Sequence, residues 1–389
     1  MTKTQQRESF DIIIIGAGSI GLPTAFFMAE TGLDVLVIDQ FPSAGQSSNK
    51  HAIGGIRATH SDPAKIHLGK RSLETFSRWQ DIHGDDIEWV QGGYSFVAYT
   101  EKNAALLKDL VNWQQQNDLN ISWLDHKELL EIIPHINQVE LLGGTFSPED
   151  GSASPLKTAY AFHRRAVQAG AKFKFNETVL EIVSSDSRVT GVITDRGHYS
   201  CKWVINAAGG WAKQLSANLG LHVPVEPDSH EAAITESVAK LFEPMIVDMR
   251  ARPGSANFYF YQHPTGKIIF CMTPEPPIVG THTIASSSFL PIAARRLIEI
   301  MPVLQHIRVR RVWRGIYPMT PDGSPIIGSV DGLDGYLLAV GMCGQGFMFG
   351  PGVGQLLTHV VLNQIDGADK IILESLTYHR TFETEEMLK

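Results

Sequence analysis

The sequence is poor in cysteine, in excess positive charge and in long apolar runs. Its three cysteines, Cys201, Cys271 and Cys343, are widely spaced and odd in number. We therefore expect no disulfide framework and no metal site, which fits a reducing compartment and a cytoplasmic location. Basic residues number 33 against 41 acidic ones, so the chain has no excess positive charge that would attract a nucleic acid.

Two further absences concern the membrane. No stretch approaches the roughly 18 consecutive apolar residues of a membrane span, so none is expected. Residues 1–9 are polar and lack the apolar core of a signal peptide. The composition, 43% hydrophobic and 19% charged, is typical of a globular protein. A chain of 389 residues is longer than one that usually folds around a single hydrophobic core. We expect two domains.

The first 40 residues show the pattern of a strand, a glycine turn, a helix and a second strand. Residues 12–15 are four isoleucines, typical of a strand buried on both faces of a parallel sheet. A helix is predicted over 22–31 and a second buried strand over 35–38, ending at Asp39. The arrangement is one βαβ unit.

Gly16, Gly18 and Gly21 give this unit the spacing G-x-G-x-x-G. The first glycine permits a tight turn, the second lets the backbone approach a pyrophosphate, and the third lets helix and strand pack closely. The helix N-terminus favours phosphate, and Asp39 is placed to accept hydrogen bonds from ribose hydroxyls. These features predict a dinucleotide site, but they do not distinguish FAD from NAD.

More sheet and helix segments follow along the chain. Helical spacing of apolar residues is found over 66–79 and 102–116, strands are predicted over 94–99 and within 258–272, and 41–57 is expected to be loop. The segments 203–211 and 336–340 resemble the first strand, and a last helix is predicted over 351–362. The dinucleotide-binding domain is expected to comprise 1–90, 145–215 and 320–389, and the second domain 91–144 and 216–319.

Two later segments favour FAD. Residues 206–211 form a strand end rich in small residues, and the glycine-rich turn 341–347 opens the last helix. The N-terminus of that helix would stabilise negative charge on a reduced flavin.

These segments, together with residues 54–57, 313–328 and 344–354, resemble the D-amino-acid oxidase superfamily of FAD-dependent oxidoreductases, and within it the sarcosine oxidase and proline dehydrogenase β-subunit branch. The resemblance implies an α/β fold: an FAD-binding Rossmann-like domain of glutathione-reductase type and a second α+β substrate domain of mixed sheet and helices. It also implies oxidation of a secondary or primary amino or imino acid (sarcosine, proline, glycine or a D-amino acid) by hydride transfer to flavin N5.

The fingerprint and the resemblance together predict a set of cofactor-binding residues. They are Gly16, Gly18, Ser19, Ile20, Gly21, Asp39, Gln40, Ser47, Ser48, His51, Val179, Ala208, Gly209, Trp211, Gly344, Gln345, Gly346, Phe347 and Met348. His51 lies in a segment similar to one in which dimethylglycine-dehydrogenase-like enzymes attach FAD covalently. Its neighbours differ from that segment, which favours a non-covalent role.

Five residues are predicted to bind or orient the substrate: Arg57, His60, Tyr259, Tyr261 and Tyr317. The guanidinium of Arg57 would grip a carboxylate with two parallel hydrogen bonds; the alternatives are that it packs over the flavin or forms a surface ion pair. His60 is a second candidate for the carboxylate. Tyr259, Tyr261 and His263 alternate along a strand and would line a pocket, although such a face is often plain core.

Departures from the family pattern bear on which subfamily the sequence resembles. Tyr317 stands where glycine and D-amino-acid oxidases have a carboxylate-binding arginine. Met348 and the pair Ile269 and Phe270 stand where sarcosine oxidases place lysines, which favours a dehydrogenase over an oxidase. Gly315 replaces a flavin-linking cysteine. The electron acceptor, O2 or a partner subunit or electron carrier, and the choice between homo- and hetero-oligomer stay open.

Two other functions remain alternatives. One keeps the fold and oxidises a 2-hydroxy acid or glycerol phosphate, which would require extra basic residues for its anion. The other is a flavin-carrying subunit of a hetero-oligomeric dehydrogenase. Retention of Arg57 and Tyr317 favours a substrate site in this chain.

Overall fold

The computed structural model describes residues 8–383 and 386–388, so most of the polar segment 1–9 lies outside it. The chain forms two compact units. The first comprises Met1–Ala52, Pro155–Pro227 and Tyr317–Glu386; the second comprises Ile53–Ser154, Asp228–Ile316 and Met387–Lys389. No helix of the described residues is long and apolar enough to cross a lipid bilayer.

The first unit contains a sheet with the strand order β17-β18-β10-β11-β1-β2-β8, with β9 paired to β10. Its strands are β1 (Glu8–Ile15), β2 (Val35–Asp39), β8 (Lys172–Phe175), β9 (Val179–Ser185), β10 (Arg188–Thr194), β11 (His198–Asn206), β17 (Ile326–Val330) and β18 (Leu333–Val340). The four isoleucines of β1 are at most 5% exposed, because β11 and β2 flank this strand in parallel. The continuous apolar run thus forms the middle of the sheet.

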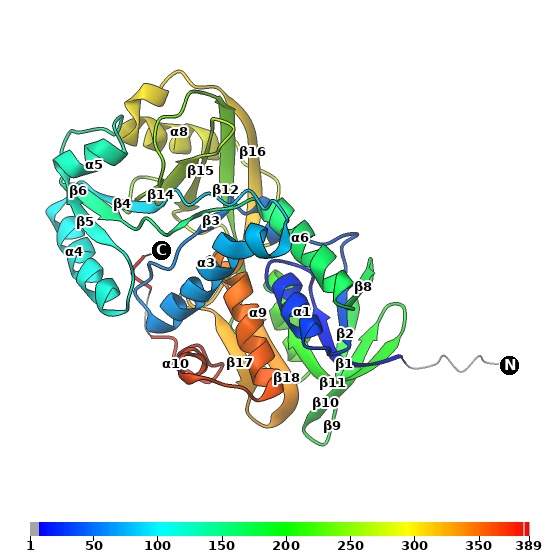
Figure 1. Ribbon diagram of the computed structural model, residues 1–389. Coiled ribbons are helices and arrows are strands. Elements are labelled where there is room, and N and C mark those ends of the chain that lie inside the picture. Colours follow the sequence, from blue (N-terminus) through cyan, green and yellow to red (C-terminus); the bar gives the residue numbers. More distant parts are fainter. Residues whose placement is uncertain (1–7, 384–385, 389) are drawn as a thin grey trace. The chain divides into compact units, whose positions relative to one another are not determined.

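The helices of the first unit are α1 (Gly21–Glu30), α2 (Ser48–His51), α6 (Pro155–Gln168), α7 (Ala212–Ala217), α9 (Gly346–Leu362) and α10 (Gly367–Ser375), with the 3-10 turn η1 (Gly209–Trp211). Helix α1 packs against α6 and α9, the latter drawn in orange beside the blue α1 (Figure 1). A Cβ at Gly350 would lie 2.1 Å from the Ser19 carbonyl oxygen. Glycine there lets α9 approach the start of α1 closely.

The second unit is built on a sheet of order β16-β12-β15-β14-β13-β4-β6-β5. Its strands are β4 (Tyr94–Ala98), β5 (Ser122–Asp125), β6 (Gly143–Phe146), β12 (Glu226–Ser237), β13 (Met245–Asp248), β14 (Ser255–Gln262), β15 (Lys267–Pro274) and β16 (Val309–Met319), and β3 (Gly55–Ile56) pairs separately with β7 (Gly151–Ser152). The helices are α3 (Pro63–His83), α4 (Glu101–Gln116), α5 (His126–Ile132) and α8 (Phe289–Ile300), with η2 (Pro302–Leu304).

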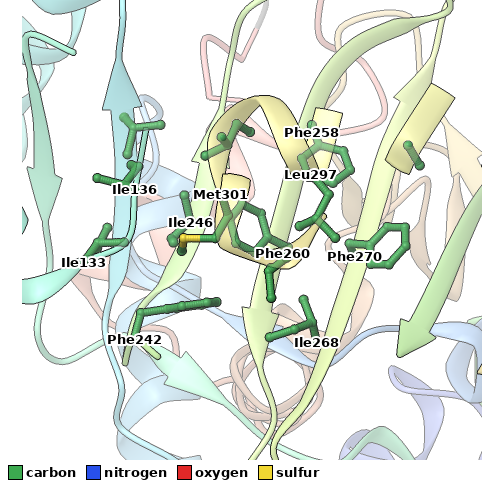
Figure 2. Packing of buried hydrophobic residues seen from close by; sticks show 14 of the residues in the cluster. Ile133, Ile136, Phe242, Ile246, Phe258, Phe260, Ile268, Phe270, Leu297 and Met301 are labelled. Atoms are coloured by element: carbon green, nitrogen blue, oxygen red, sulfur yellow. The ribbon is translucent and has the colours of Figure 1, made fainter. Parts of the chain in front are cut away.

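The two faces of this sheet have different neighbours. Figure 2 shows Phe260 and Phe270 gathered with Leu297 of α8 in the core of one face. Tyr259 and Tyr261 alternate with Phe258 and Phe260 along β14 and join a second cluster on the opposite face. The second face therefore carries the tyrosines predicted to bind substrate.

The structure differs from the sequence predictions at several boundaries. The helix predicted as the last one is α9, which begins at Gly346 and runs through Pro351, the predicted first residue; α10 follows it. Close packing of Gly350 on Ser19 overrides that local signal. The predicted loop 41–57 contains α2 and β3.

The prediction grouped residues 53–90 with the first domain, whereas they belong to the second compact unit. The reason is a strand pairing that sequence patterns do not show. Strand β3 pairs with β7, and α3 follows β3 and precedes β4 in the chain, so both of its neighbours belong to the second unit.

Candidate functional site

The glycine turn of the first unit is held against the end of β11. Gly16 has φ of +109°, and a Cβ there would lie 2.6 Å from the Ala207 carbonyl oxygen. A Cβ at Gly21 would lie 1.9 Å from the Gly16 carbonyl oxygen, so this glycine permits the strand-to-helix approach. Gly18 differs, because no atom lies within 4 Å of its ideal Cβ. The turn therefore leaves open space at the position predicted to face a pyrophosphate.

The carboxylate of Asp39 reinforces this turn. It accepts hydrogen bonds from the backbone N–H of Ala17 at 2.6 Å and of Phe41 at 2.8 Å. Burial raises the pKa of Asp39, although these two hydrogen bonds favour its charged form. Because a carboxylate offers about four acceptor positions, capacity remains for ribose hydroxyls.

The loop after Asp39 also reaches the glycine turn, since Gly45 N–H donates to the Ala17 carbonyl at 2.8 Å. Within this loop Gln40 is exposed. Ser47 has φ of +52°, a conformation that side chains rarely adopt. Ser48 and His51 are half-buried at the two ends of the short helix α2.

The end of β11 is fixed by the buried side chain of Asn206. Its amide nitrogen donates to the Ser216 hydroxyl at 3.1 Å and the Tyr336 hydroxyl at 3.0 Å, while its oxygen accepts from Ala208 N–H at 3.1 Å. Trp211, two residues beyond Gly209, lies edge-on to Phe41 with ring centroids 5.9 Å apart.

The C-terminal glycine turn joins the same unit. Cys343 and Gly344 have φ of +49° and +81°, and a Cβ at Gly344 would lie 2.2 Å from the Tyr317 ring. The ideal Cβ of Gly346 lies 3.3 Å from Ser19 Oγ. The structure thus brings the first turn and the last turn together, with Tyr317 packed on the latter. Val179 is buried in the core cluster of the sheet, two residues after Glu177, whose N–H donates to the Asp39 carbonyl at 3.1 Å.

The residues present fit a flavin dinucleotide. Gln345, at the N-terminus of α9, is buried, and its side-chain oxygen has no hydrogen-bond partner among the described residues. A buried polar atom without a partner costs free energy, so a bound group that donates a hydrogen bond would satisfy it. Phe347 and Met348 follow in the first turn of α9, whose N–H groups favour negative charge.

In the second unit, Arg57 is buried against the aromatic sheet face. Its guanidinium carbon lies 5.3 Å from the centroid of the Phe96 ring. Nη1 donates to the Thr59 carbonyl, and Nη2 donates to the Leu388 carbonyl at 2.6 Å. The side chain is 6% exposed, so the structure contradicts a surface ion pair.

Asp150 is bonded to the loop of residues 57–60 that contains Arg57. Its carboxylate accepts hydrogen bonds from Ala58 N–H at 2.9 Å, from the Thr59 hydroxyl at 3.1 Å and from the Ser147 hydroxyl at 2.6 Å. Burial raises the pKa of Asp150 to about 6 despite these hydrogen bonds and the nearby Arg57 charge. His60, also fully buried, ends this loop, and its carbonyl accepts from Gln114 at 3.0 Å.

The two tyrosines lie on one face of β14. Tyr259 belongs to a cross-strand row in which Val247 and Cys271 are its direct partners. Tyr261 is buried, its hydroxyl donates to the Ile53 carbonyl at 2.6 Å, and burial raises its pKa. His263, predicted to extend this row, instead lies in the turn after β14, where its ring nitrogen is 2.8 Å from the Thr265 hydroxyl.

Sequence reasoning missed His230 on β12. Ala232 pairs with Cys271, the partner of Tyr259, and strand alternation places His230 on the same face. Its Nε2 lies 3.5 Å from Asp228 Oδ2. Burial acts to raise the pKa of Asp228, but the interaction with His230 and the backbone hydrogen bonds at Ser229 and Ile278 together outweigh it, and the net pKa is lowered. Asp228 and His230, which alternate around Ser229 in the sequence, were the available signal.

One group of the described residues, His359, Asp366 and Asp369, has donor atoms within 4.8 Å of one another. Asp366 and Asp369 form the reciprocal capping box of α10, and His359 Nδ1 lies 2.8 Å from Asp369 Oδ2. The capping role accounts for both carboxylates.

The first sheet with its parallel centre, the glycine turn against α1 and the second mixed sheet define a dinucleotide-binding oxidoreductase of two compact units. The family model described as FAD dependent oxidoreductase (DAO) matches residues 11–360. The chain belongs to this family, and its cofactor is FAD.

Individual relatives agree with this family. The hydrogen cyanide synthase subunit HcnC of Pseudomonas protegens is 29% identical over 72% of this chain and 65% of its own length. The 4-methylaminobutanoate oxidase (formaldehyde-forming) of Paenarthrobacter nicotinovorans is 25% identical over 92% of this chain and 44% of its own. The chain thus spans less than two thirds of these curated relatives. The structure of L-proline dehydrogenase from P. horikoshii is similar with a TM-score of 0.89 and 27% identity, over 96% of this chain and 98% of that one.

Proposed function

We propose that this protein oxidises the amine of a small amino or imino acid. The observation that carries the proposal is the buried guanidinium of Arg57 on a sheet face that also presents Tyr259 and Tyr261. A buried cation on an aromatic surface suits a carboxylate with a short apolar body.

The proposed reaction requires little acid–base catalysis by the protein. Bound FAD supplies a hydride acceptor at its N5 atom. Arg57 would orient the carboxylate and thereby select which C–H bond reacts, while the aromatic face would exclude water. The Rossmann-like unit would bind FAD through residues 16–21, 206–211 and 341–348, and the second unit would bind the substrate.

Relatives support an amine substrate. The names 4-methylaminobutanoate oxidase and L-proline dehydrogenase both describe molecules that combine an amine with a carboxylate. We propose a secondary amine of this kind, such as sarcosine or proline, as the first substrate to test.

The electron acceptor is part of the proposal. Ile269, buried in β15, and Met348, in the first turn of α9, supply no positive charge where sarcosine oxidases are expected to have lysines. We propose a dehydrogenase that passes electrons to a partner subunit or carrier, and the similarity to a hydrogen cyanide synthase subunit favours a hetero-oligomer.

An anaerobic screen tests the function. The holoprotein is mixed with sarcosine, proline, glycine, D-alanine, lactate and glycerol 3-phosphate, and flavin absorbance is followed. Bleaching by amines alone is the expected result, and bleaching by the hydroxy compounds alone would overturn it. Admitting air afterwards separates rapid reoxidation by O2 from the slow reoxidation expected here.

A further inference from the structure

The segment Met387–Leu388 occupies the place where the proposed substrate would bind. The Leu388 carbonyl accepts a hydrogen bond from Arg57 Nη2 at 2.6 Å. A carboxylate oxygen on this guanidinium would occupy the same position. The Leu388 carbonyl oxygen therefore occupies the position that one oxygen of a substrate carboxylate would take.

The side chain of Leu388 covers the aromatic face. It is 2% exposed and belongs to the cluster that contains Tyr94, Phe96 and Tyr261, with Tyr259 packed against that cluster. Met387 N–H donates to the Ser61 hydroxyl at 3.2 Å. Polar contacts and an apolar anchor thus hold the segment on the surface that would receive the substrate.

The Leu388 carbonyl and a substrate carboxylate compete for the guanidinium of Arg57. A guanidinium holds a carboxylate with two parallel hydrogen bonds, from either Nη1 and Nη2 or Nε and Nη2. Both arrangements use one of the two N–H groups of Nη2, and the Leu388 carbonyl occupies one of them. A carboxylate that binds on the side facing the aromatic cluster, where Leu388 is buried, therefore requires the Leu388 carbonyl to move.

We propose that Met387–Leu388 is a gate that a carboxylate ligand displaces from Arg57; this inference rests on the proposed function. The displacement favours carboxylates, since two charge-assisted hydrogen bonds and the attraction of opposite charges replace a single bond to a neutral carbonyl. Neutral amines cannot compete in this way. The gate would thus make the site selective for acids at the cost of affinity.

The gate has a measurable consequence for affinity. When only a fraction of the molecules is open, the apparent Kd is the intrinsic Kd divided by that fraction, so an open population near one tenth weakens binding about tenfold. Leu388→Ala removes the apolar anchor and raises the open fraction. We expect it to tighten carboxylate binding several-fold.

The experiment uses pyrrole-2-carboxylate, a planar acid without an oxidisable α C–H bond, titrated calorimetrically into the holoprotein. Wild type, Leu388→Ala and the matched control Leu156→Ala, an exposed leucine of α6, are compared. Tighter binding to Leu388→Ala alone is expected. Equal affinity for all three, or no binding to any, overturns the gate.

Hydrogen exchange on the wild type gives a second readout that does not depend on how well a variant folds. Saturating pyrrole-2-carboxylate should speed exchange in the peptide containing Met387 and Leu388, whereas unchanged or slower exchange overturns the gate. The proposed function fails separately, if no amine bleaches the flavin. The gate can fail while amines still bleach it.

Discussion

The carboxylate of Asp150 accepts a hydrogen bond from the Thr59 hydroxyl at 3.1 Å, and the Thr59 carbonyl in turn accepts one from Arg57. Asp150 is therefore the buried support of the loop that positions Arg57. Burial raises its pKa from the ordinary 3.8 to about 6. This relationship links loop order and stability to pH.

The raised pKa of Asp150 predicts a pH-dependent stability. Because folding favours the protonated form, its contribution is fully present below about pH 4 and is lost as the pH rises to about 6. A shift of roughly two units corresponds to about 3 kcal/mol. In Asp150→Asn this contribution is absent, so its unfolding free energy should fall less between pH 4 and 6.

Urea unfolding of the apoprotein at several pH values measures this difference. Asp81→Asn, which neutralises an exposed carboxylate of α3, is the control and should follow the wild type. Parallel curves for wild type and Asp150→Asn would contradict the raised pKa.

Gly18→Ala should separate cofactor binding from folding. The site has open space around the added methyl group and no positive φ, so the fold should tolerate alanine. The methyl would, however, block close approach of the pyrophosphate. We expect an apoprotein with wild-type melting temperature and FAD binding weakened about tenfold or more, measured by titration of flavin fluorescence.

Gly367→Ala is the matched control, because this glycine also has open space around its Cβ position but starts α10. Gly21→Ala should behave differently from both and destabilise the apoprotein, since its methyl would meet the Gly16 carbonyl. Normal FAD affinity in Gly18→Ala would refute the assigned role of the turn.

Gln345→Leu should have opposite effects on the two forms of the protein. In the apoprotein it removes a buried oxygen without a partner, which stabilises by about 1–3 kcal/mol. In the holoprotein it removes a proposed hydrogen bond to the flavin, so FAD affinity should fall. Thermal unfolding with and without FAD checks both signs; equal shifts in the two forms would exclude contact between Gln345 and the cofactor.

Arg57→Ala should abolish the proposed carboxylate grip. Loss of two charge-assisted hydrogen bonds is expected to lower kcat/KM for carboxylated amines by about 100-fold or more, because each contributes roughly 1.5–3 kcal/mol. Arg57→Lys should recover little of it, since an ammonium cannot form the parallel pair.

Stopped-flow reduction of the flavin gives these constants, with Arg311→Ala, an exposed residue of β16, as the control. If Arg57→Ala keeps wild-type kinetics, Arg57 does not bind the substrate. A drop in the flavin potential with unchanged KM would instead favour the alternative that Arg57 tunes the cofactor.

The fingerprint could be predicted because its signals are local. Four consecutive isoleucines, the glycine spacing and the terminal Asp39 each restrict the backbone within a few residues, and β1, α1 and β2 match those predictions within a few residues. The start of α9 could not be predicted, since Pro351 is a local signal and the packing of Gly350 on Ser19 is a contact over more than 300 residues.

The sequence by itself thus determined the dinucleotide fingerprint, because turn chemistry and strand periodicity act over short distances. The family and FAD are indicated by the resemblance of segments along most of the chain, and the role of Arg57 stays a prediction. Only the tertiary structure decided what surrounds Arg57. Asp150, Phe96 and Leu388 reach it from three distant segments, and His230 joins the tyrosine face through strand register. Such contacts depend on the pairing of strands far apart in the chain, which no local pattern of residues specifies.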